Sequence, residues 1–235
     1  MVEFAHSIGI PVTTHEIYPA AFVGVDGTEH TAATSRRGYS TKQGPQQTAY
    51  EDVIQIMGKS GRVFDPMLSE DDTVTVKMLA DDPALKNDPR FKLYPGWIQE
   101  QVAGFARGGR GSAPPLTGRS GNGKMVMDAM RAGALVVTGT DRPLAIKLNA
   151  DIVSNVAIGM TPYEAMKTAT VNPAQAMALD AGTIEPGKLA DLVMVEGNPF
   201  QKIEDVYKVR RVILNGRVYE LEDLLKSGTS VSSTK

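Results

Sequence analysis

Short apolar runs alternate with longer amphipathic segments in the first part of the chain. The runs IGIPVTTH, FVGVDGTEH, RVFDPML and ALVVTGTDRP each predict a buried strand with a polar end, over residues 8–15, 22–30, 62–68 and 134–143. Residues 47–61 and 121–133 lie between them, carry apolar side chains at helical spacing and end at glycines. Because this alternation is typical of parallel strands joined by helical crossovers, it predicts an α/β fold.

Two later helix starts carry clear signals. Thr161 is followed by Pro162 and Glu164, which predicts an N-cap, a first helical residue and the partner of a capping box. Asn172 followed by Pro173 repeats the pattern and predicts a second N-cap.

These patterns divide the chain into three parts. We expect an α/β domain over residues 1–179, with a helical insertion at about 69–124. Runs rich in β-formers, separated by glycine, proline and Asn-Gly turns, predict a small β unit over residues 180–227. Residues 228–235 are expected to be disordered because they have little apolar surface to bury.

Composition narrows the classes of protein and of chemistry. A chain of 235 residues with 42% hydrophobic content can form a substantial core. Its formal net charge of -2 gives no reason to expect a nucleic-acid partner. The absence of cysteine excludes disulfides, thiolate metal ligands and cysteine nucleophiles. Because the start does not resemble a leader and no apolar run is long enough to span a bilayer, we expect a cytoplasmic protein without a membrane partner.

Three chemically versatile side chains fall at predicted strand ends. His15 ends the first strand, His30 ends the second, and Asp141 lies near the end of the fourth. In parallel sheets ligands bind beyond the carboxyl ends of the strands, so we expect these groups to share one pocket. The simpler alternative is that each histidine only forms hydrogen bonds with nearby backbone. We expect His6, on a predicted helix, to be structural.

The segment after His30 is dense in hydroxyl groups and cations and could supply a nucleophile. A serine needs a nearby base, and acyl transfer also needs donors for the developing oxyanion. The candidates are Ser35 or Ser40 as nucleophile, Lys42, Tyr39 or a strand-end histidine as base, Arg36 and Arg37 as anion stabilisers, and Asp141 with Arg142 as orienting groups. The alternative is a solvated polar loop without a role in chemistry.

Three motifs in order resemble the carboxyl-terminal half of the amidohydrolase superfamily, in its imidazolonepropionase and prolidase-like branch. They are GIPVTTHE with GVDGTEH, then AGALVVTGTDRP, then the long stretch from GMTPYEAMKTATVNPAQAMALDAGTIEPGKLADLVMV to VRRVILNGRVY. The resemblance implies a (β/α)8 barrel with a small β domain and hydrolysis by metal-bound water. It implies that His15 and His30 end strands five and six, and that Asp141 is the metal-binding aspartate of strand eight.

The chain departs from the family pattern on its amino-terminal side. The family's His-x-His pair on strand one, and its usual lysine or other ligand on strand four, have no counterpart here. We therefore expect a truncated, half TIM-type β/α barrel that carries strands five to eight. Such a half barrel leaves two sheet edges uncovered, so we expect a homodimer or a higher even homo-oligomer.

These expectations lead to three hypotheses of function. The first is a carboxylesterase-like hydrolase of small ester or amide substrates, with a serine nucleophile and no metal cofactor. The second is a zinc-dependent amidohydrolase or dipeptidase, in which His15, His30 and Asp141 bind the metal and another chain or segment completes the site. The third is an oligomeric binding scaffold without catalytic activity.

Overall fold

The structure is a computed structural model that describes residues 1–18, 20–31, 42–44, 48–68, 88–105, 118, 121–141 and 145–228. The side chains of residues 101–105, 227 and 228 are not among those described. Of the tail that we expect to be disordered, residues 228–235, the part from 229 to 235 lies outside the described residues, and its disorder stays a prediction.

Four parallel strands form the sheet that the sequence predicts. They are β1 (Thr13–Thr14), β2 (Gly27–Glu29), β3 (Val63–Asp65) and β4 (Leu135–Val136), and they lie side by side in chain order. Gly27 pairs with both Thr13 and Val63, and Val63 also pairs with Leu135. Since all four strands run in the same direction, their carboxyl ends lie along one edge of the sheet.

The strands are shorter than the sequence predicts. The first run, residues 8–15, becomes a strand only at Thr13, and helix α1 (Val2–Ser7) precedes it. The second run begins inside the 3-10 helix η1 (Ala20–Val23), where the Phe22 side chain is 83% exposed. The strand assignments of residues 8–12 and 22–26 were therefore wrong, because apolar composition alone does not fix which residues join the hydrogen-bonded ladder.

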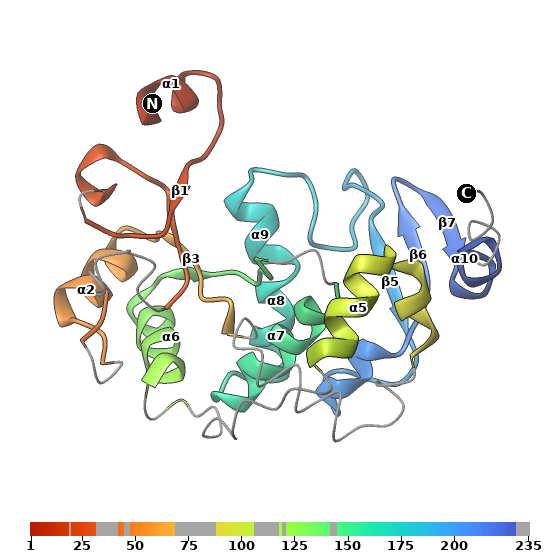
Figure 1. Ribbon diagram of the computed structural model, residues 1–235. Coiled ribbons are helices and arrows are strands. Elements are labelled where there is room, and N and C mark those ends of the chain that lie inside the picture. Colours follow the sequence, from red (N-terminus) through yellow and green to blue (C-terminus); the bar gives the residue numbers. More distant parts are fainter. Residues whose placement is uncertain are drawn as a thin grey trace.

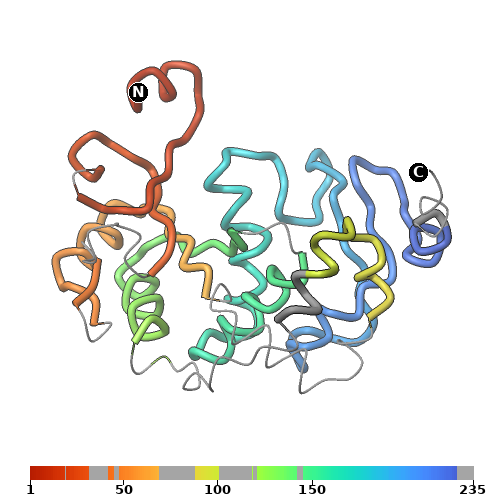
Figure 2. The backbone as a smooth tube through the Cα atoms, in the orientation of Figure 1, coloured from red at the N-terminus to blue at the C-terminus, as the bar shows by residue number. Residues whose placement is uncertain are grey.

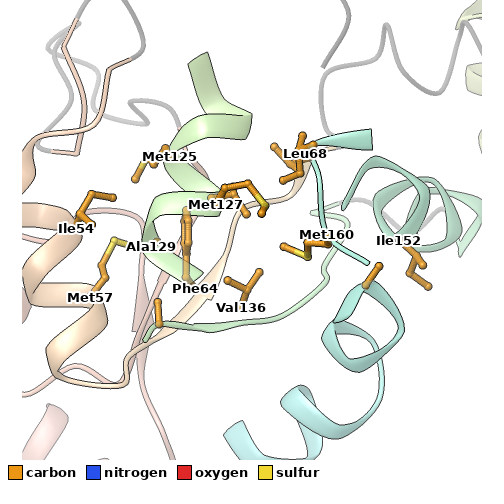
Figure 3. Packing of buried hydrophobic residues seen from close by; sticks show 14 of the residues in the cluster. Ile54, Met57, Phe64, Leu68, Met125, Met127, Ala129, Val136, Ile152 and Met160 are labelled. Atoms are coloured by element: carbon orange, nitrogen blue, oxygen red, sulfur yellow. The ribbon is translucent and has the colours of Figure 1, made fainter. Parts of the chain in front are cut away.

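Two helices cover one face of this sheet. Helix α2 (Glu51–Lys59) packs against α6 (Gly121–Ala132), as Figure 1 shows. A Cβ atom on Gly58 would lie 2.4 Å from the Ala132 side chain, so glycine allows the two helices to approach closely. Figure 3 shows the core that this packing buries, in which Phe64 of β3 and Val136 of β4 are neighbours and Met57 of α2 belongs to the same cluster.

Helices α7 (Ala145–Ala157), α8 (Pro162–Thr168) and α9 (Val171–Ala176) follow the sheet. The predicted capping box is confirmed, because the Glu164 amide donates to Thr161 and the Glu164 side chain accepts from the Thr161 amide. The predicted N-cap role of Asn172 is wrong, because α9 begins at Val171 with Thr170 as its N-cap. The Asn172 side chain instead donates to the Val136 carbonyl of β4 at 2.7 Å.

The predicted β unit is an antiparallel sheet. Strands β5 (Leu192–Val195), β6 (Val209–Leu214) and β7 (Arg217–Glu220) pair in chain order. Figure 2 shows these blue segments on the side of the molecule opposite α2, which is orange. The 3-10 helix η4 (Ile203–Tyr207) precedes β6, and helix α10 (Leu221–Gly228), which the sequence pattern did not predict, follows β7.

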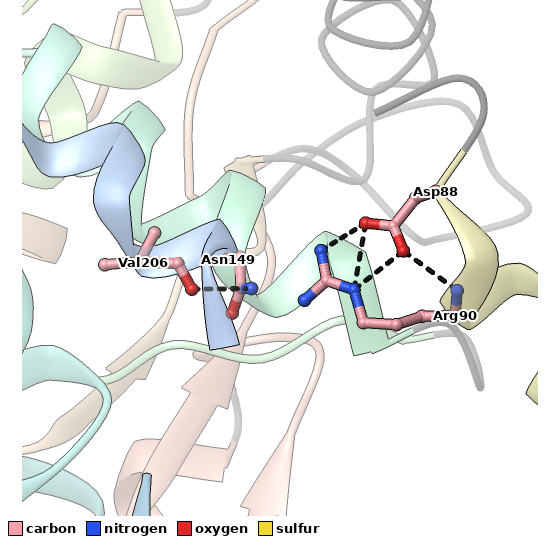
Figure 4. A network of polar contacts seen from close by, with 4 residues as sticks. All are labelled: Asp88, Arg90, Asn149 and Val206. Atoms are coloured by element: carbon pink, nitrogen blue, oxygen red, sulfur yellow. Dashed lines mark hydrogen bonds and ion pairs between the residues drawn. The ribbon is translucent and has the colours of Figure 1, made fainter. Parts of the chain in front are cut away.

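The described part of the expected insertion is helical. It comprises the 3-10 helix η3 (Pro89–Leu93) and helix α5 (Gly96–Phe105). Asp88 caps η3 by accepting from the Arg90 amide at 2.9 Å, and it also pairs with the Arg90 guanidinium (Figure 4). Nearby, the Asn149 side chain of α7 donates to the Val206 carbonyl of η4 at 3.2 Å, which links the helices to the β unit. No helix in the described ranges is long and apolar enough to cross a membrane.

Candidate functional site

Two histidines meet at the carboxyl edge of the parallel sheet. His15 directly follows β1 and His30 directly follows β2, and their ring centroids are 5.1 Å apart with an angle of 56° between the ring planes. His30 is 5% exposed, whereas His15 is open to solvent. The sheet therefore brings together the two imidazoles that the sequence placed at neighbouring strand ends, and it buries one of them.

The backbone of His30 has a conformation that is rare for a residue with a side chain. Its φ is 58°, in the left-handed region. Its amide donates to the Asp65 carbonyl of β3 at 2.8 Å, and its own carbonyl accepts from the Lys42 ammonium at 2.7 Å. Such a conformation costs on the order of 1 kcal/mol or more, so these contacts on both sides of the residue are needed to maintain it.

Lys42 lies beneath the histidine pair and is fully buried. Its ammonium donates to the carbonyls of His15 at 2.6 Å and of Glu29 at 2.5 Å, in addition to that of His30. Burial lowers the pKa of Lys42 to about 8, although Glu16 and Glu29 oppose this shift. This geometry does not support the expected role of Lys42 as a base, because a base must present a free lone pair to the substrate.

Asp65 is a residue of this edge that the sequence reasoning missed. It ends β3, and its Oδ1 atom is buried. Burial, and then the charges of nearby Glu29 and Asp151, raise the pKa of its carboxyl to about 8, although hydrogen bonds from the Met67 and Gly139 amides oppose the shift. At neutral pH this carboxyl is mostly protonated and can act as a proton donor. The signal in the sequence was an acidic residue at a strand end, directly before Pro66.

A group of buried polar side chains on helix α7 approaches the same region. Asp151 and Asn155 are both 0% exposed, and the charge of Asp151 acts on Asp65. Asn155 donates to the Thr168 hydroxyl at 3.2 Å, and the hydroxyls of Thr138 and Thr168 lie 2.6 Å apart. These contacts hold α7 and α8 against the segment that follows β4.

Asp141 and His6 are not brought into this group. Asp141 lies beyond β4 with a φ of 46°, and its side chain is exposed. His6 lies on α1, where its ring contacts the Asp26 carboxylate at 2.9 Å. The following candidates lie outside the described residues, so their roles stay predictions: Ser35, Arg36, Arg37, Tyr39, Ser40 and Arg142.

The described residues do not supply the ligand set of a catalytic zinc. Such a zinc takes about three protein ligands and leaves a position open for water. His15 and His30 could supply two ligands, since their rings are adjacent. Within the described ranges, however, no three histidine, aspartate or glutamate side chains gather into a group that could hold a metal, so Asp141 does not complete the expected set.

Comparison with known proteins identifies related sequences. Residues 1–219 match the model of the Amidohydrolase family. An adenine deaminase from Methanosphaera stadtmanae is 44% identical over 71 residues, which are 30% of this chain and 12% of that protein. An imidazolonepropionase from Shouchella clausii is 36% identical over 90 residues, which are 35% of this chain and 20% of that protein.

Solved structures share the fold at low sequence identity. A Xaa-Pro dipeptidase with bound methionine in the active site has a TM-score of 0.59 and 23% identity, and the match covers 93% of this chain and 47% of that one. Molinate hydrolase has a TM-score of 0.64 and 18% identity, with coverage of 99% and 48%. The chain thus spans about half the length of these proteins.

Proposed function

This chain belongs to the amidohydrolase family, and from that premise we propose that it hydrolyses carboxylic ester or amide bonds of small substrates at the carboxyl edge of its parallel sheet. The observation that carries the proposal is the contact between the His15 and His30 rings, 5.1 Å apart, next to the strand that ends in Asp65. Related proteins named Xaa-Pro dipeptidase and imidazolonepropionase support a hydrolytic reaction.

The proposed nucleophile is a hydroxyl of the segment between Thr31 and Lys42. Both flanking residues are buried at the sheet edge. Ser40 is two residues before Lys42, so an extended chain limits the distance between their Cα atoms to about 7 Å. Ser35 is four residues after Thr31, which gives a limit of about 14 Å. These limits permit either serine to approach the histidine pair.

The proposed reaction proceeds through an acyl-enzyme. A histidine of the pair takes the serine proton, the serine Oγ forms a bond to the substrate carbonyl carbon, and the bond to the leaving group breaks. The Asp65 carboxyl, with its raised pKa, is suited to give a proton to the leaving alcohol or amine. Water then attacks the acyl carbon and gives a proton to the Asp65 carboxylate, the bond to the serine Oγ breaks as the histidine returns its proton to that oxygen, and the acid is released. Arg36 and Arg37 are the proposed stabilisers of the developing negative charge.

A chromogenic short-chain ester tests this function. We expect the purified chain to hydrolyse p-nitrophenyl acetate faster than free imidazole at the same concentration, and at the same rate after dialysis against a chelator. Activity that the chelator abolishes would support the zinc-dependent alternative. A chain that hydrolyses neither esters nor amides would contradict the proposal and favour a binding scaffold.

Serine replacements test the nucleophile. We expect either Ser35→Ala or Ser40→Ala to lower kcat by about a thousandfold or more, because the acyl-enzyme can no longer form. The variant at the other serine is the matched control and should keep most of the activity. If both variants keep the wild-type rate, the serine mechanism is wrong.

We also propose that the chain acts as a homodimer. Apolar side chains near the amino terminus support an interface there, since Phe4 is 70% exposed and Phe22 is 83% exposed. Sedimentation equilibrium should give twice the chain mass of 25.2 kDa, and a monomer at micromolar concentration would contradict this assembly.

A further inference from the structure

The Lys42 side chain connects two strand ends that are distant in sequence from its own position. One ammonium group has three N–H donors, and the carbonyls of His15, Glu29 and His30 accept them at 2.6, 2.5 and 2.7 Å. His15 follows β1, while Glu29 and His30 lie at the end of β2. The same cation therefore fixes both segments that carry the histidine rings.

The backbone of Lys42 is fixed at the start of helix α2. The Lys42 carbonyl accepts from the amide of Tyr50, the N-cap of α2, at 3.1 Å. Gln43 and Ala49 form an isolated antiparallel bridge next to it. Lys42 therefore links the start of α2, which packs in the core, to the carboxyl ends of β1 and β2.

We propose that Lys42 positions His15 and His30 for catalysis through their backbone carbonyls, without contacting the substrate. The consequence for catalysis rests on the proposed function, whereas the effect on the two rings does not. His30 is the sensitive residue, because its left-handed backbone is held by Asp65 on one side and by Lys42 on the other. Without the ammonium, the three carbonyls lose the hydrogen bonds that it donates, and the His30 backbone can relax.

Histidine NMR measures this effect directly. The chain has only three histidines. His6 lies on α1 and contacts the Asp26 carboxylate, so the signal of His6 serves as an internal control. In the wild type we expect a nuclear Overhauser effect between the rings of His15 and His30. The Lys42→Met variant keeps an unbranched apolar side chain but loses the ammonium, so this effect should disappear while the His6 signals stay unchanged. The kcat/KM for the ester should fall by about tenfold to a hundredfold, as expected for misplaced catalytic groups.

Chemical restoration separates the charge from the general effect of a core substitution. Because the chain has no cysteine, Lys42→Cys contains one thiol, which can be alkylated in denaturant before refolding. Bromoethylamine restores an ammonium at nearly the original distance, whereas iodoacetamide, the matched control, adds a neutral amide of similar length. We expect the ring-to-ring effect to return only in the aminoethylated protein. If Lys42→Met does not fold, the comparison of these two alkylated proteins tests the positioning role of the ammonium in its place.

A second control removes another buried cation. Lys147 on α7 is also 0% exposed, and Lys147→Met should lower the overall stability while keeping the contact between the two rings. The inference is overturned if Lys42→Met keeps the ring-to-ring effect, or if the aminoethylated protein fails to regain it. If the wild type shows the effect but hydrolyses no ester, the proposed function fails and the positioning role stands.

Discussion

Replacing Asp65 by asparagine should remove a strong pH dependence of folding stability. Asparagine has the same size and cannot ionise. The folded protein raises the pKa of Asp65 from 3.8 to about 8, mainly by burial and then through the charges of Glu29 and Asp151. The folded state therefore keeps a proton that the unfolded chain has already lost. This stabilisation is complete below the unfolded pKa and is lost as the pH rises through about 8.

The size of the effect follows from proton linkage. Where only the unfolded chain is ionised, the free energy of unfolding falls by about 1.4 kcal/mol per pH unit. Because the slope flattens as the pH approaches the folded pKa, the loss between pH 5 and pH 7 amounts to about 2.5 kcal/mol. A domain of ordinary stability has about 5 to 15 kcal/mol in total, so this change is readily measured.

Urea unfolding at pH 5, 6 and 7 provides the assay, with the fluorescence of the chain's one tryptophan as the signal. The wild type should lose about 2.5 kcal/mol more than Asp65→Asn across this range. The control is Asp223→Asn on α10, where the carboxylate is exposed, and it should follow the wild type. If Asp65→Asn shows the same pH dependence as the wild type, Asp65 does not hold a proton in the folded state and its proposed role as proton donor is refuted.

Three further substitutions test the surroundings of the site. In Gly139→Ala the new Cβ would lie 1.9 Å from Asp65 Oδ2, so urea unfolding should show that the free energy of unfolding falls by about 1 to 3 kcal/mol. The control is Gly96→Ala, whose new Cβ would have no atom within 4 Å and should cost no stability. Thr161→Ala removes the capping box and should cost about 1 kcal/mol in the same assay, most of which Thr161→Ser should restore. Asn172→Ala removes the bond to β4 and should cost about 1 kcal/mol, and an unchanged midpoint would show that this contact adds no stability.

The sequence predicted the sheet edge well because parallel topology is a strong constraint. Once the strands were placed in order, their carboxyl ends had to lie along one edge, and His15 and His30 had to be neighbours. The capping box of Thr161 was equally predictable because it depends on residues three apart in the chain. The Asn172 prediction failed because a tertiary bond to β4 uses that side chain.

The charges at the site could not be predicted from local patterns. Asp65 is influenced by Glu29 and Asp151, which are far from it in sequence, and its pKa depends on burial that only the folded core creates. Lys42 looked like one of several cations in a polar loop, yet it is fully buried among carbonyls. Each residue acquires its properties from contacts between segments, which composition and periodicity do not contain.

The most direct test of the account is the rate of ester hydrolysis after replacement of single histidines. His30→Gln removes a ring of the pair at the sheet edge, and we expect kcat/KM for p-nitrophenyl acetate to fall by about a hundredfold or more. His6→Gln, on α1, should hydrolyse the ester at the wild-type rate. Equal rates for the wild type and His30→Gln would contradict the claim that the histidine pair is the centre of a hydrolytic site.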